Sequence, residues 1–240
     1  MLRAVIFDFD GVIVDSEALH LRSFNRVLAR YGVEITTKDY YQDYLGLTDL
    51  DCFKLLIDKG KLKLNPSQIE ELLKDKNREF ERLARTQAHT IEGVPEFLQM
   101  LKQNNIPMAI YSGALLEEIE LMLKQSNLRY FFEVIVSAED VEKSKPDPEG
   151  FLLALEKLNR RRPLAQTPQN SSTEKKENPI MPNECVVIED SHWGLEAAKA
   201  AGMHTVAITN SYDAEQLRAA EKTITKLSEL KIDDLQRLCV

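Results

Sequence analysis

The sequence predicts an α/β fold in which a three-layer parallel-sheet core carries an inserted, all-helical domain. An unbroken apolar run at residues 4–7 suggests a strand that is buried on both faces. From residue 15 to about residue 91 only helical patterns occur, whereas strands and helices alternate from residue 93 onward. Such alternation is typical of a parallel sheet with right-handed crossovers. We therefore expect a core formed by residues 1–14 and 92–240, and an inserted domain formed by residues 15–91.

The composition narrows the class of protein. Of the 240 residues, 43% are hydrophobic and 29% are charged, which is ordinary for a globular protein. The net charge of −8 and the lack of an extended basic face argue against nucleic acid as a partner. No apolar stretch approaches the length of a membrane span, and the sequence begins directly with a strand rather than a signal peptide. We therefore predict a cytoplasmic protein without a membrane partner.

The inserted domain is expected to contain four helices. Glu17 to Tyr31 has one apolar stripe and ends at Gly32, a residue suited to a helix C-terminus. Residues 37–45 form the second expected helix. The third, residues 48–59, begins with Thr48 as its N-cap. The fourth begins after Asn65 with Pro66 at its first position, and extends to about residue 86.

The remainder of the core is expected to contain four further strands separated by helices. The expected strands are residues 107–111, 133–136, 184–188 and 204–208, and the expected helices are residues 93–103, 115–125, 148–158 and 192–201. After Tyr212 we expect a helix, a short extended piece at residues 223–225 and a last short helix. The scattered cysteines Cys52, Cys185 and Cys239 are odd in number and indicate buried thiols rather than disulfides.

Residues 159–182 differ from the rest of the core. This segment is polar, contains four prolines and shows no periodicity. It is longer than an ordinary connection between a helix and a strand. We interpret it as a flexible surface insertion, with contact to an acidic partner through its basic residues as the alternative.

The first expected strand ends in two carboxylates. Asp8 and Asp10 are two positions apart, so an extended backbone would direct both side chains to the same side. Gly11 then permits a sharp turn. The carboxyl ends of central strands are where open α/β sheets bind their ligands. Two carboxylates held close together repel one another unless a cation or a shared proton relieves the repulsion, which is a first reason to suspect a metal ion here.

Three more expected strands lead into polar residues. Ser112 and Gly113 precede a helix, where a hydroxyl and free backbone N–H groups bind anions. Lys145 follows the third strand, and Glu189 and Asp190 follow the fourth. Each cluster alone has an ordinary structural interpretation, for example Ser112 as an N-cap. Together, the carboxylates suit a hard cation such as Mg²⁺, while the lysine and hydroxyl suit a phosphoryl group.

Four motifs in order, DFDGVIVDSE, Ser112-Gly113, Lys145-Pro146 and VVIEDSHWGLEAAKAAGM, resemble those of the haloacid dehalogenase superfamily. The resemblance covers the chain except residues 159–182 and is strongest for the branch that contains β-phosphoglucomutase and phosphoglycolate phosphatase. It implies a Rossmann-like core and identifies the inserted domain as an α-helical cap. It also implies that the first strand lies beside the fourth, so that Asp8 and Asp190 meet.

The resemblance implies a role for each motif residue. Asp8 would be the nucleophile that accepts the phosphoryl group, and Asp10 would be the general acid and then the general base. Mg²⁺ would be held by Asp8, the backbone carbonyl of Asp10 and Asp190, with Glu189 as a ligand or a support. Ser112, Gly113 and Lys145 would hold the phosphoryl oxygens.

The implied activity is a Mg²⁺-dependent phosphatase for a small phosphorylated metabolite, either a sugar phosphate or a compound similar to phosphoglycolate. The first alternative is a β-phosphoglucomutase-like mutase. His20 and Lys76 resemble mutase positions, but the stretch from Tyr40 to Phe53 contains no Lys or Arg that would hold a second phosphate. The second alternative is a catalytically silent binding protein on the same fold.

The cap is expected to select the substrate. Hinges are expected near residues 14–16 and 89–93, and the loop with Gly46, Leu47 and Thr48 is expected to touch the leaving group. The alternative is that this loop only packs on the core. Dehalogenation is disfavoured because the metal-free dehalogenases of the family lack an acid equivalent to Asp10. We expect a monomer or a weak homodimer.

Overall fold

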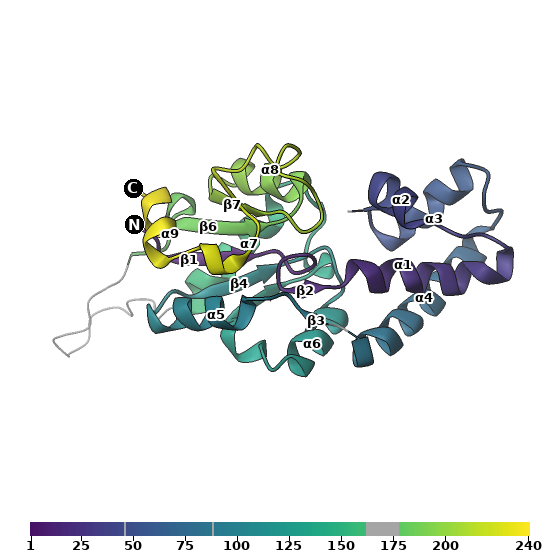
Figure 1. Ribbon diagram of the computed structural model, residues 1–240, viewed down its shortest axis with the longest axis horizontal. Coiled ribbons are helices and arrows are strands. Elements are labelled where there is room, and N and C mark those ends of the chain that lie inside the picture. Colours follow the sequence, from purple (N-terminus) through teal and green to yellow (C-terminus); the bar gives the residue numbers. More distant parts are fainter. Residues whose placement is uncertain (46, 88, 162–177) are drawn as a thin grey trace.

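A computed structural model describes residues 1–45, 47–87, 89–161 and 178–240 of the chain. Its centre is a parallel sheet of six strands in the order β5-β4-β1-β6-β7-β8 (Figure 1). The strands are β1 (Ala4–Phe7), β4 (Met108–Tyr111), β5 (Val134–Val136), β6 (Cys185–Glu189), β7 (His204–Ile208) and β8 (Lys222–Ile224). The four core strands expected after the first are all present, and the extended piece at residues 223–225 corresponds to β8.

The first strand lies in the middle of the sheet. Phe7 pairs in parallel with Ile110 of β4 on one side and with Ile188 of β6 on the other. Along the chain, β4 and β5 therefore extend the sheet on one side of β1, and β6, β7 and β8 extend it on the other side. The order of strands reverses beside β1, which is the position where open α/β sheets form a ligand-binding crevice.

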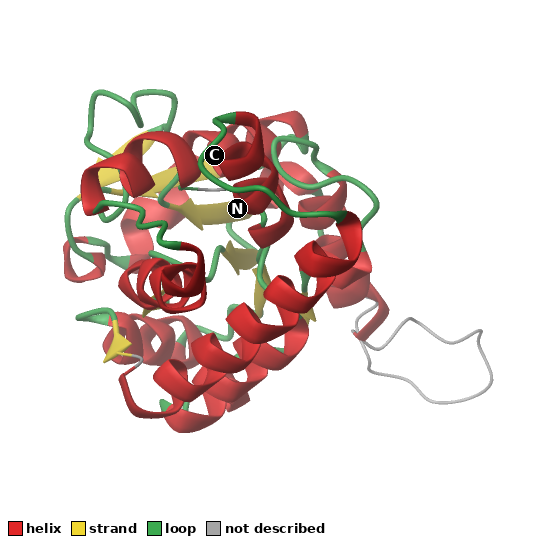
Figure 2. Ribbon diagram, turned by 90° about the vertical axis from the view of Figure 1, so that its right-hand side faces the viewer, coloured by secondary structure: helices red, strands yellow, loops and turns green. Residues whose placement is uncertain are grey.

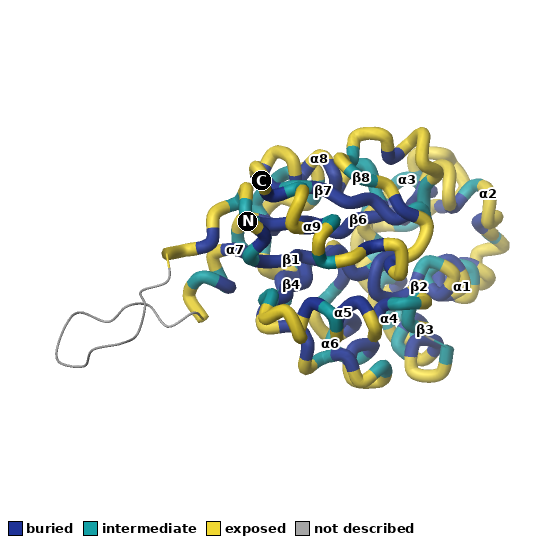
Figure 3. Tube along the Cα trace, turned by 60° about the vertical axis from the view of Figure 1, so that its left-hand side comes forward, coloured by how far each residue is buried: buried dark blue, intermediate teal, exposed yellow. Residues whose placement is uncertain are grey.

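Helices cover both faces of the sheet. Val5 and Phe7 pack with α5 (Val94–Gln103), α6 (Leu116–Gln125) and α9 (Ile232–Leu238), whereas Ala4 and Ile6 pack with α7 (Glu149–Arg161) and α8 (His192–Ala200). Alternate residues of a strand point to opposite faces, so β1 must be apolar throughout. Figure 3 shows β1, β4 and β6 as buried tubes inside these layers.

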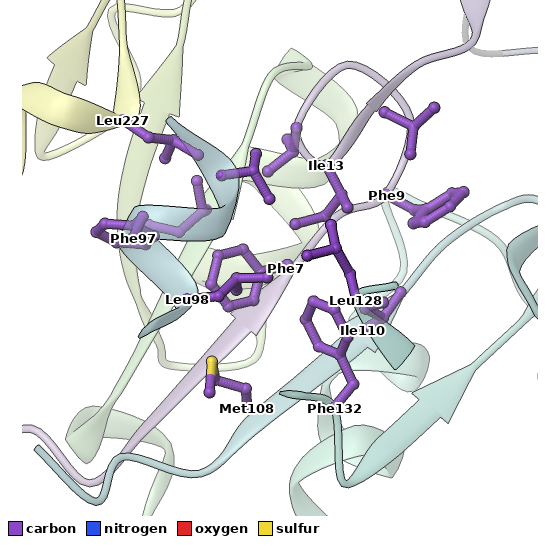
Figure 4. Close-up of a cluster of buried hydrophobic side chains, with 14 of the residues drawn as sticks. Phe7, Phe9, Ile13, Phe97, Leu98, Met108, Ile110, Leu128, Phe132 and Leu227 are labelled. Carbon is purple, nitrogen blue, oxygen red and sulfur yellow. The ribbon is translucent and has the colours of Figure 1, made fainter. Parts of the chain in front are cut away.

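Aromatic contacts anchor one of these layers. The ring of Phe7 lies edge-on to Phe97 of α5 and to Phe132, with centroids 6.0 and 5.8 Å away (Figure 4). Phe7 is fully buried, and truncation of such a side chain to alanine costs about 3–5 kcal/mol. This packing holds the strand that ends at Asp8.

The cap has a hydrophobic core of its own. It comprises α1 (Glu17–Leu28), α2 (Thr37–Asp39), a π-helical segment (Tyr40–Tyr44), α3 (Asp49–Asp58) and α4 (Pro66–Gln87). Viewed from the cap side, its helices lie in front of the sheet (Figure 2). The side chain of Thr48 accepts a hydrogen bond from the Asp51 backbone N–H, which confirms Thr48 as the N-cap of α3.

The two connections between cap and core pair with each other. Val14 of β2 (Val14–Asp15) lies opposite Thr90 of β3 (His89–Thr90) in a short antiparallel ribbon. Hinges are expected at both segments from the sequence, but the pairing of these segments as strands is not. A further backbone hydrogen bond, from Ile91 to Ile13, extends the ribbon toward the core. The cap is therefore attached through one paired element.

One predicted helix is wrong. Residues 213–220 form turns instead of a helix after Tyr212. Leu217 is the buried apolar side chain of this stretch, and a single turn, closed by a hydrogen bond from its N–H to the Asp213 carbonyl, is enough to bury it. The chain then enters β8 directly. Single turns of 3₁₀-helix occur at Ala29–Tyr31, Arg129–Phe131, Ala138–Asp140, Pro182–Glu184 and Leu227–Glu229.

The expected insertion at residues 159–182 is described only at its ends. Helix α7 continues to Arg161, and residues 162–177 lie outside the described residues. The side-chain amide of Asn159 exchanges two hydrogen bonds with the backbone of Ile180, so the two ends of the segment are tied together.

Two compositional predictions have structural counterparts. Cys52, Cys185 and Cys239 are buried free thiols, as expected. Within the described ranges, none of the helices has both the length and the apolar character that a membrane crossing requires.

Candidate active site

A cavity of about 550 Å³ lies between the cap and the carboxyl ends of the strands. Most of the residues singled out from the sequence line it. These are Asp8, Asp10, His20, Leu47, Thr48, Ser112, Gly113, Lys145 and Asp190. Glu189 and Lys76 are fully buried just behind its wall. Gly46, which was expected in the cap loop, lies outside the described residues.

Asp8, Glu189 and Asp190 converge as the strand order requires. Carboxylate oxygens of the three residues lie within 4.8 Å of one another. Asp8 follows β1 directly, and its N–H donates to the carbonyl of Ile188 at 2.9 Å, which extends the pairing with β6. The neighbouring strands therefore bring together side chains that are far apart in the sequence.

Lys145 bridges two of these acids. Its Nζ donates to Oδ1 of Asp8 at 2.7 Å and to Oε1 of Glu189. The ammonium group also lies 5.1 Å from the ring centroid of Tyr111. The charge that Lys145 supplies offsets part of the repulsion that the sequence analysis anticipated between the buried acids.

Glu189 is saturated with protein donors. Its Oε2 accepts hydrogen bonds from the backbone N–H groups of Asp190 and Ser191 and from the Ser191 hydroxyl, each at 2.9 Å. Its other oxygen accepts from Lys145. Gly194 leaves room for this carboxylate, because a Cβ there would lie 1.7 Å from Oε1. The arrangement suits a support for Lys145 and for the turn that carries Asp190.

Asp190 has the opposite character. It is buried, and its Oδ2 atom has no hydrogen-bond partner among the described residues. A Cβ at Gly11 would lie only 1.8 Å from this oxygen, so the turn after Asp10 must be glycine, which here adopts φ +73°. An unpartnered carboxylate oxygen beside Asp8 fits a divalent cation with oxygen ligands. The donor set is therefore consistent with Mg²⁺.

Asp10 points to a different set of partners. Its Oδ1 accepts a hydrogen bond from the hydroxyl of Ser16, and its Oδ2 accepts one from the hydroxyl of Ser112 at 3.2 Å. Ser16 is fully buried at the start of the cap and was not singled out from the sequence. The two hydroxyls hold the Asp10 carboxyl at the junction of cap and core.

Burial raises the pKa values of the central acids. The pKa of Asp8 is raised to about 8 by burial and by Glu189, although Lys145 opposes the shift. Burial also raises the pKa of Asp10, against the hydrogen bonds from Ser16 and Ser112. The pKa of Asp190 is raised by burial and by the nearby charge of Asp8. The ionised forms of these acids are thus disfavoured in the cation-free site, and a cation bound beside them would favour ionisation.

The cap side of the cavity contains an ion pair between a fully buried lysine and a partly exposed aspartate. Lys76 Nζ lies 2.6 Å from Oδ2 of Asp49 and 2.8 Å from Nδ1 of His20. His20 stacks on Phe80 with ring centroids 4.1 Å apart, and burial together with Lys76 lowers its pKa. Lys76, expected to contact substrate, is thus engaged inside the cap, while its neighbour Asn77 lines the cavity.

Further cavity residues follow β7. Ser211 and Tyr212 line the cavity, and the side chain of Asn210 donates to the carbonyl of Gly11 at 2.7 Å. The strand itself is predicted from the sequence, whereas the residues at its carboxyl end were not among the predicted site residues. The rule that located the other strand-end clusters also applies to residues 209–212. Glu17 and Trp193, which also line the cavity, lie within the first and last of the quoted motifs but were not singled out from the sequence. Glu118 lies outside the motifs, and no local pattern marks it as a cavity residue.

The fold and site define a capped α/β enzyme with a buried acidic centre at the end of its first strand. The family model described as haloacid dehalogenase-like hydrolase matches residues 5–208. The chain therefore belongs to the haloacid dehalogenase-like hydrolase family, in the branch related to β-phosphoglucomutase and sugar phosphate phosphatases.

Individual relatives agree with this assignment. A phosphorylated carbohydrates phosphatase from Thermotoga maritima is 30% identical over 205 residues, covering 85% of this chain and 84% of the relative. A fructose-1-phosphate phosphatase from Escherichia coli is 27% identical and covers 85% of this chain and 95% of its own length. Together with the family, such relatives place the chain among the phosphoric monoester hydrolases.

A solved structure confirms the architecture. The crystal structure of β-phosphoglucomutase from Clostridium difficile superposes with a TM-score of 0.81 at 23% identity, covering 100% of this chain and 97% of that one. At this identity the likeness supports the fold alone: a six-stranded parallel sheet with a helical cap.

Proposed function

We propose that the protein is a Mg²⁺-dependent phosphatase that hydrolyses monophosphates of small sugars. The observation that carries the proposal is the convergence of Asp8, Lys145 and Asp190 at the end of β1, inside a cavity lined by both the cap and the core. The related phosphatases of carbohydrate phosphates support the same substrate class.

Asp8 is proposed as the nucleophile. Its side chain lines the cavity while its backbone is fixed in the sheet, so the carboxylate is held ready for attack on phosphorus. Attack forms a bond from a carboxylate oxygen to phosphorus and breaks the bond to the leaving oxygen, which produces an aspartyl-phosphate. Lys145, which contacts Asp8, is placed to neutralise phosphoryl oxygens, together with the backbone N–H of Gly113, which lines the cavity.

Asp10 is proposed as the general acid and then the general base. Its raised pKa favours a protonated carboxyl that can donate to the leaving oxygen. The resulting carboxylate then accepts a proton from the water that hydrolyses the aspartyl-phosphate. The hydroxyls of Ser16 and Ser112 hold the carboxyl in position through both steps.

Asp8, Asp190 and the backbone carbonyl of Asp10 would hold the Mg²⁺ ion, and Glu189 would support them through Lys145 and the Asp190 N–H. Bound there, the cation supplies positive charge that screens the acids from the phosphoryl group. The unpartnered Oδ2 of Asp190 is the atom that most needs this ligand.

The phosphatase is favoured over the phosphomutase by the charge of the cavity wall. Of the described residues that line the cavity, Lys145 is the one Lys or Arg, and it is committed to the acidic centre. Asp49 and Glu17 line the region near the cap. A mutase must also bind the second phosphate of a bisphosphate intermediate, and these acids would repel it.

The test is an assay of the purified protein with Mg²⁺ on a panel of sugar monophosphates, including β-glucose 1-phosphate. We expect phosphate release to exceed isomerisation, and Asp8→Asn to lower hydrolysis at least about 1,000-fold. Asp58→Asn, an exposed substitution in α3, is the matched control and should retain full activity. Isomerisation faster than phosphate release, or a fully active Asp8→Asn variant, would overturn the proposal.

A further inference from the structure

The inference concerns Glu118, a buried carboxylate that the proposed chemistry does not use. Glu118 lies in the first turn of α6, is only 6% exposed and lines the cavity. Its Oε2 accepts a hydrogen bond from the backbone N–H of Leu115 at 3.3 Å, but its Oε1 has no partner among the described residues. Buried polar atoms are nearly always hydrogen-bonded, so this oxygen lacks a group that a ligand can supply.

The surroundings of Glu118 belong to both domains. The charges that act on it are those of Lys76 and Asp49 in the cap and of Asp10 in the core, and helices α4 and α6 pack together here. Lys76 is already engaged by Asp49 and His20. Glu118 therefore faces the part of the cavity that the leaving group would occupy, beyond the acidic centre that would hold the phosphoryl group.

We propose that Glu118 is a specificity-determining residue that forms a hydrogen bond with a hydroxyl group of the leaving group. It would make the enzyme select monophosphates of neutral polyhydroxylated compounds over bisphosphates and phosphorylated carboxylic acids. This inference rests on the proposed phosphatase function and names the feature of the substrate that the cap side of the site recognises.

A hydroxyl is the group that best suits this position. Burial raises the pKa of Glu118 to about 7, so that near neutral pH its carboxyl exists in both protonation states. A hydroxyl donates to the carboxylate and accepts from the carboxylic acid, whereas an anionic group can pair only with the protonated form. Glu17 and Asp49 line the same cavity and add to the repulsion of a second anion.

The competing explanation is that Glu118 only caps its helix, since it sits three residues after Leu115 and accepts its N–H. Glutamine preserves this capping hydrogen bond and the shape of the side chain but removes the negative charge. Glu118→Gln therefore separates the two roles, and Glu118→Ala removes both. Glu117→Gln changes an exposed acid in the same helical turn and is the matched control.

The experiment compares kcat/KM for three esters: D-glucitol 6-phosphate, 2-phosphoglycolate and propyl phosphate. We expect wild type and Glu117→Gln to prefer glucitol 6-phosphate. In Glu118→Gln, kcat/KM for glucitol 6-phosphate should stay within about threefold of the wild-type value, while kcat/KM for phosphoglycolate should rise about tenfold. In Glu118→Ala, kcat/KM for glucitol 6-phosphate should fall about 10- to 100-fold, mainly through a higher KM, and kcat/KM for propyl phosphate should not change. Equal changes for all three esters, or an unchanged preference in both variants, would refute a role in specificity.

A binding measurement keeps this test independent of turnover. Calorimetric titration of glucitol 6-phosphate and phosphoglycolate into Asp8→Asn, with and without Glu118→Gln, reports recognition even if no ester is hydrolysed. We expect Asp8→Asn to bind glucitol 6-phosphate more tightly than phosphoglycolate. The difference in affinity between the two esters should be smaller in the double variant that also carries Glu118→Gln. Absence of hydrolysis by the wild type would count against the proposed function alone, whereas equal binding of both esters would overturn the role of Glu118.

Discussion

Lys145 Nζ lies 2.7 Å from Oδ1 of Asp8, although the two residues are 137 positions apart in the chain. The same ammonium group also contacts Glu189, so one cation holds together the ends of β1 and β6. This arrangement concentrates three carboxylates around a single lysine and leaves Oδ2 of Asp190 without a hydrogen-bond partner among the described residues.

Lys145→Met should destabilise the metal-free protein by about 3–5 kcal/mol at pH 8, because it leaves buried carboxylates without their cation. Urea denaturation monitored by circular dichroism measures this loss. Lys143→Met, at an exposed lysine two residues earlier, is the control and should change stability by less than about 0.5 kcal/mol. A Lys145→Met variant as stable as this control would show that the ion pairs do not stabilise the fold.

In EDTA, the free energy of unfolding should fall as the pH rises from about 5 to 8. The folded-state pKa values of Asp8 (about 8), Glu17 (about 7) and Glu118 (about 7) are raised, mainly by burial. The folded state therefore binds more protons than the unfolded state in this window, and stability decreases with pH, by up to about 1.4 kcal/mol per pH unit for each group. The raised pKa of Lys145 does not change the slope of stability against pH in this window. The stability that Lys145 contributes is lost only at pH values above the pKa of the lysine in the unfolded chain.

Urea titrations at several pH values measure this slope. Mg²⁺ should flatten it, because a cation at Asp8 and Asp190 favours their ionised forms in the folded state. Stability that rises between pH 5 and 8 in EDTA, or a slope that Mg²⁺ leaves unchanged, would contradict the proposed position of the ion.

Ser16→Ala should alter the pH dependence of catalysis. The Ser16 hydroxyl donates to Asp10 and lowers its pKa, so removing it should move the alkaline limb of the kcat profile to higher pH. The turnover of esters with poor leaving groups should fall about tenfold, and that of p-nitrophenyl phosphate less, because the latter needs little protonation. Ser23→Ala, a buried serine of α1 that donates to the His20 carbonyl, should keep the wild-type profile.

Gly11→Ala should lose Mg²⁺ affinity as well as stability. The new Cβ would lie 1.8 Å from Oδ2 of Asp190, and the backbone φ is +73°. Gly60→Ala provides the control, since its φ is +69° and nothing lies within 4 Å of a Cβ there. Both variants should lose about 1 kcal/mol to backbone strain, but only Gly11→Ala should require at least about tenfold more Mg²⁺ for half-maximal activity. Equal Mg²⁺ requirements would exclude a role of this turn at the metal site.

Sequence patterns located the central strands β1, β4 and β6 because each is an apolar run that is buried on both faces. They did not reveal β2 and β3, whose two residues each form strands only because the two connections of the cap pair with one another. The helix expected after Tyr212 failed for a related reason: its composition is helical, but Leu217 alone needs burial.

The same distinction applies to the site. Asp8, Ser112 and Asp190 directly follow predicted strands, so a single geometric rule brings them to one cavity. Lys145 reaches the same cavity from the longer connection that follows β5. The position of the Ser16 hydroxyl beside Asp10 depends instead on how the cap is joined to the core. The open position beside Glu118 depends on how α4 and α6 pack. Local sequence patterns predict neither the hydrogen bond from Ser16 to Asp10 nor the open position beside Glu118, because both depend on contacts between segments that are distant in the sequence.

The central claim is that Asp8 carries the phosphoryl group during turnover, and trapping tests it most directly. Enzyme mixed with substrate and Mg²⁺ is quenched in acid, reduced with borohydride and analysed by peptide mass spectrometry. Reduction of an aspartyl-phosphate gives homoserine, which we expect at position 8 and not in the Asp8→Asn control. Homoserine at another acidic residue, or its absence from position 8 in an enzyme that turns over and accumulates a phosphoryl intermediate, would contradict the proposed mechanism.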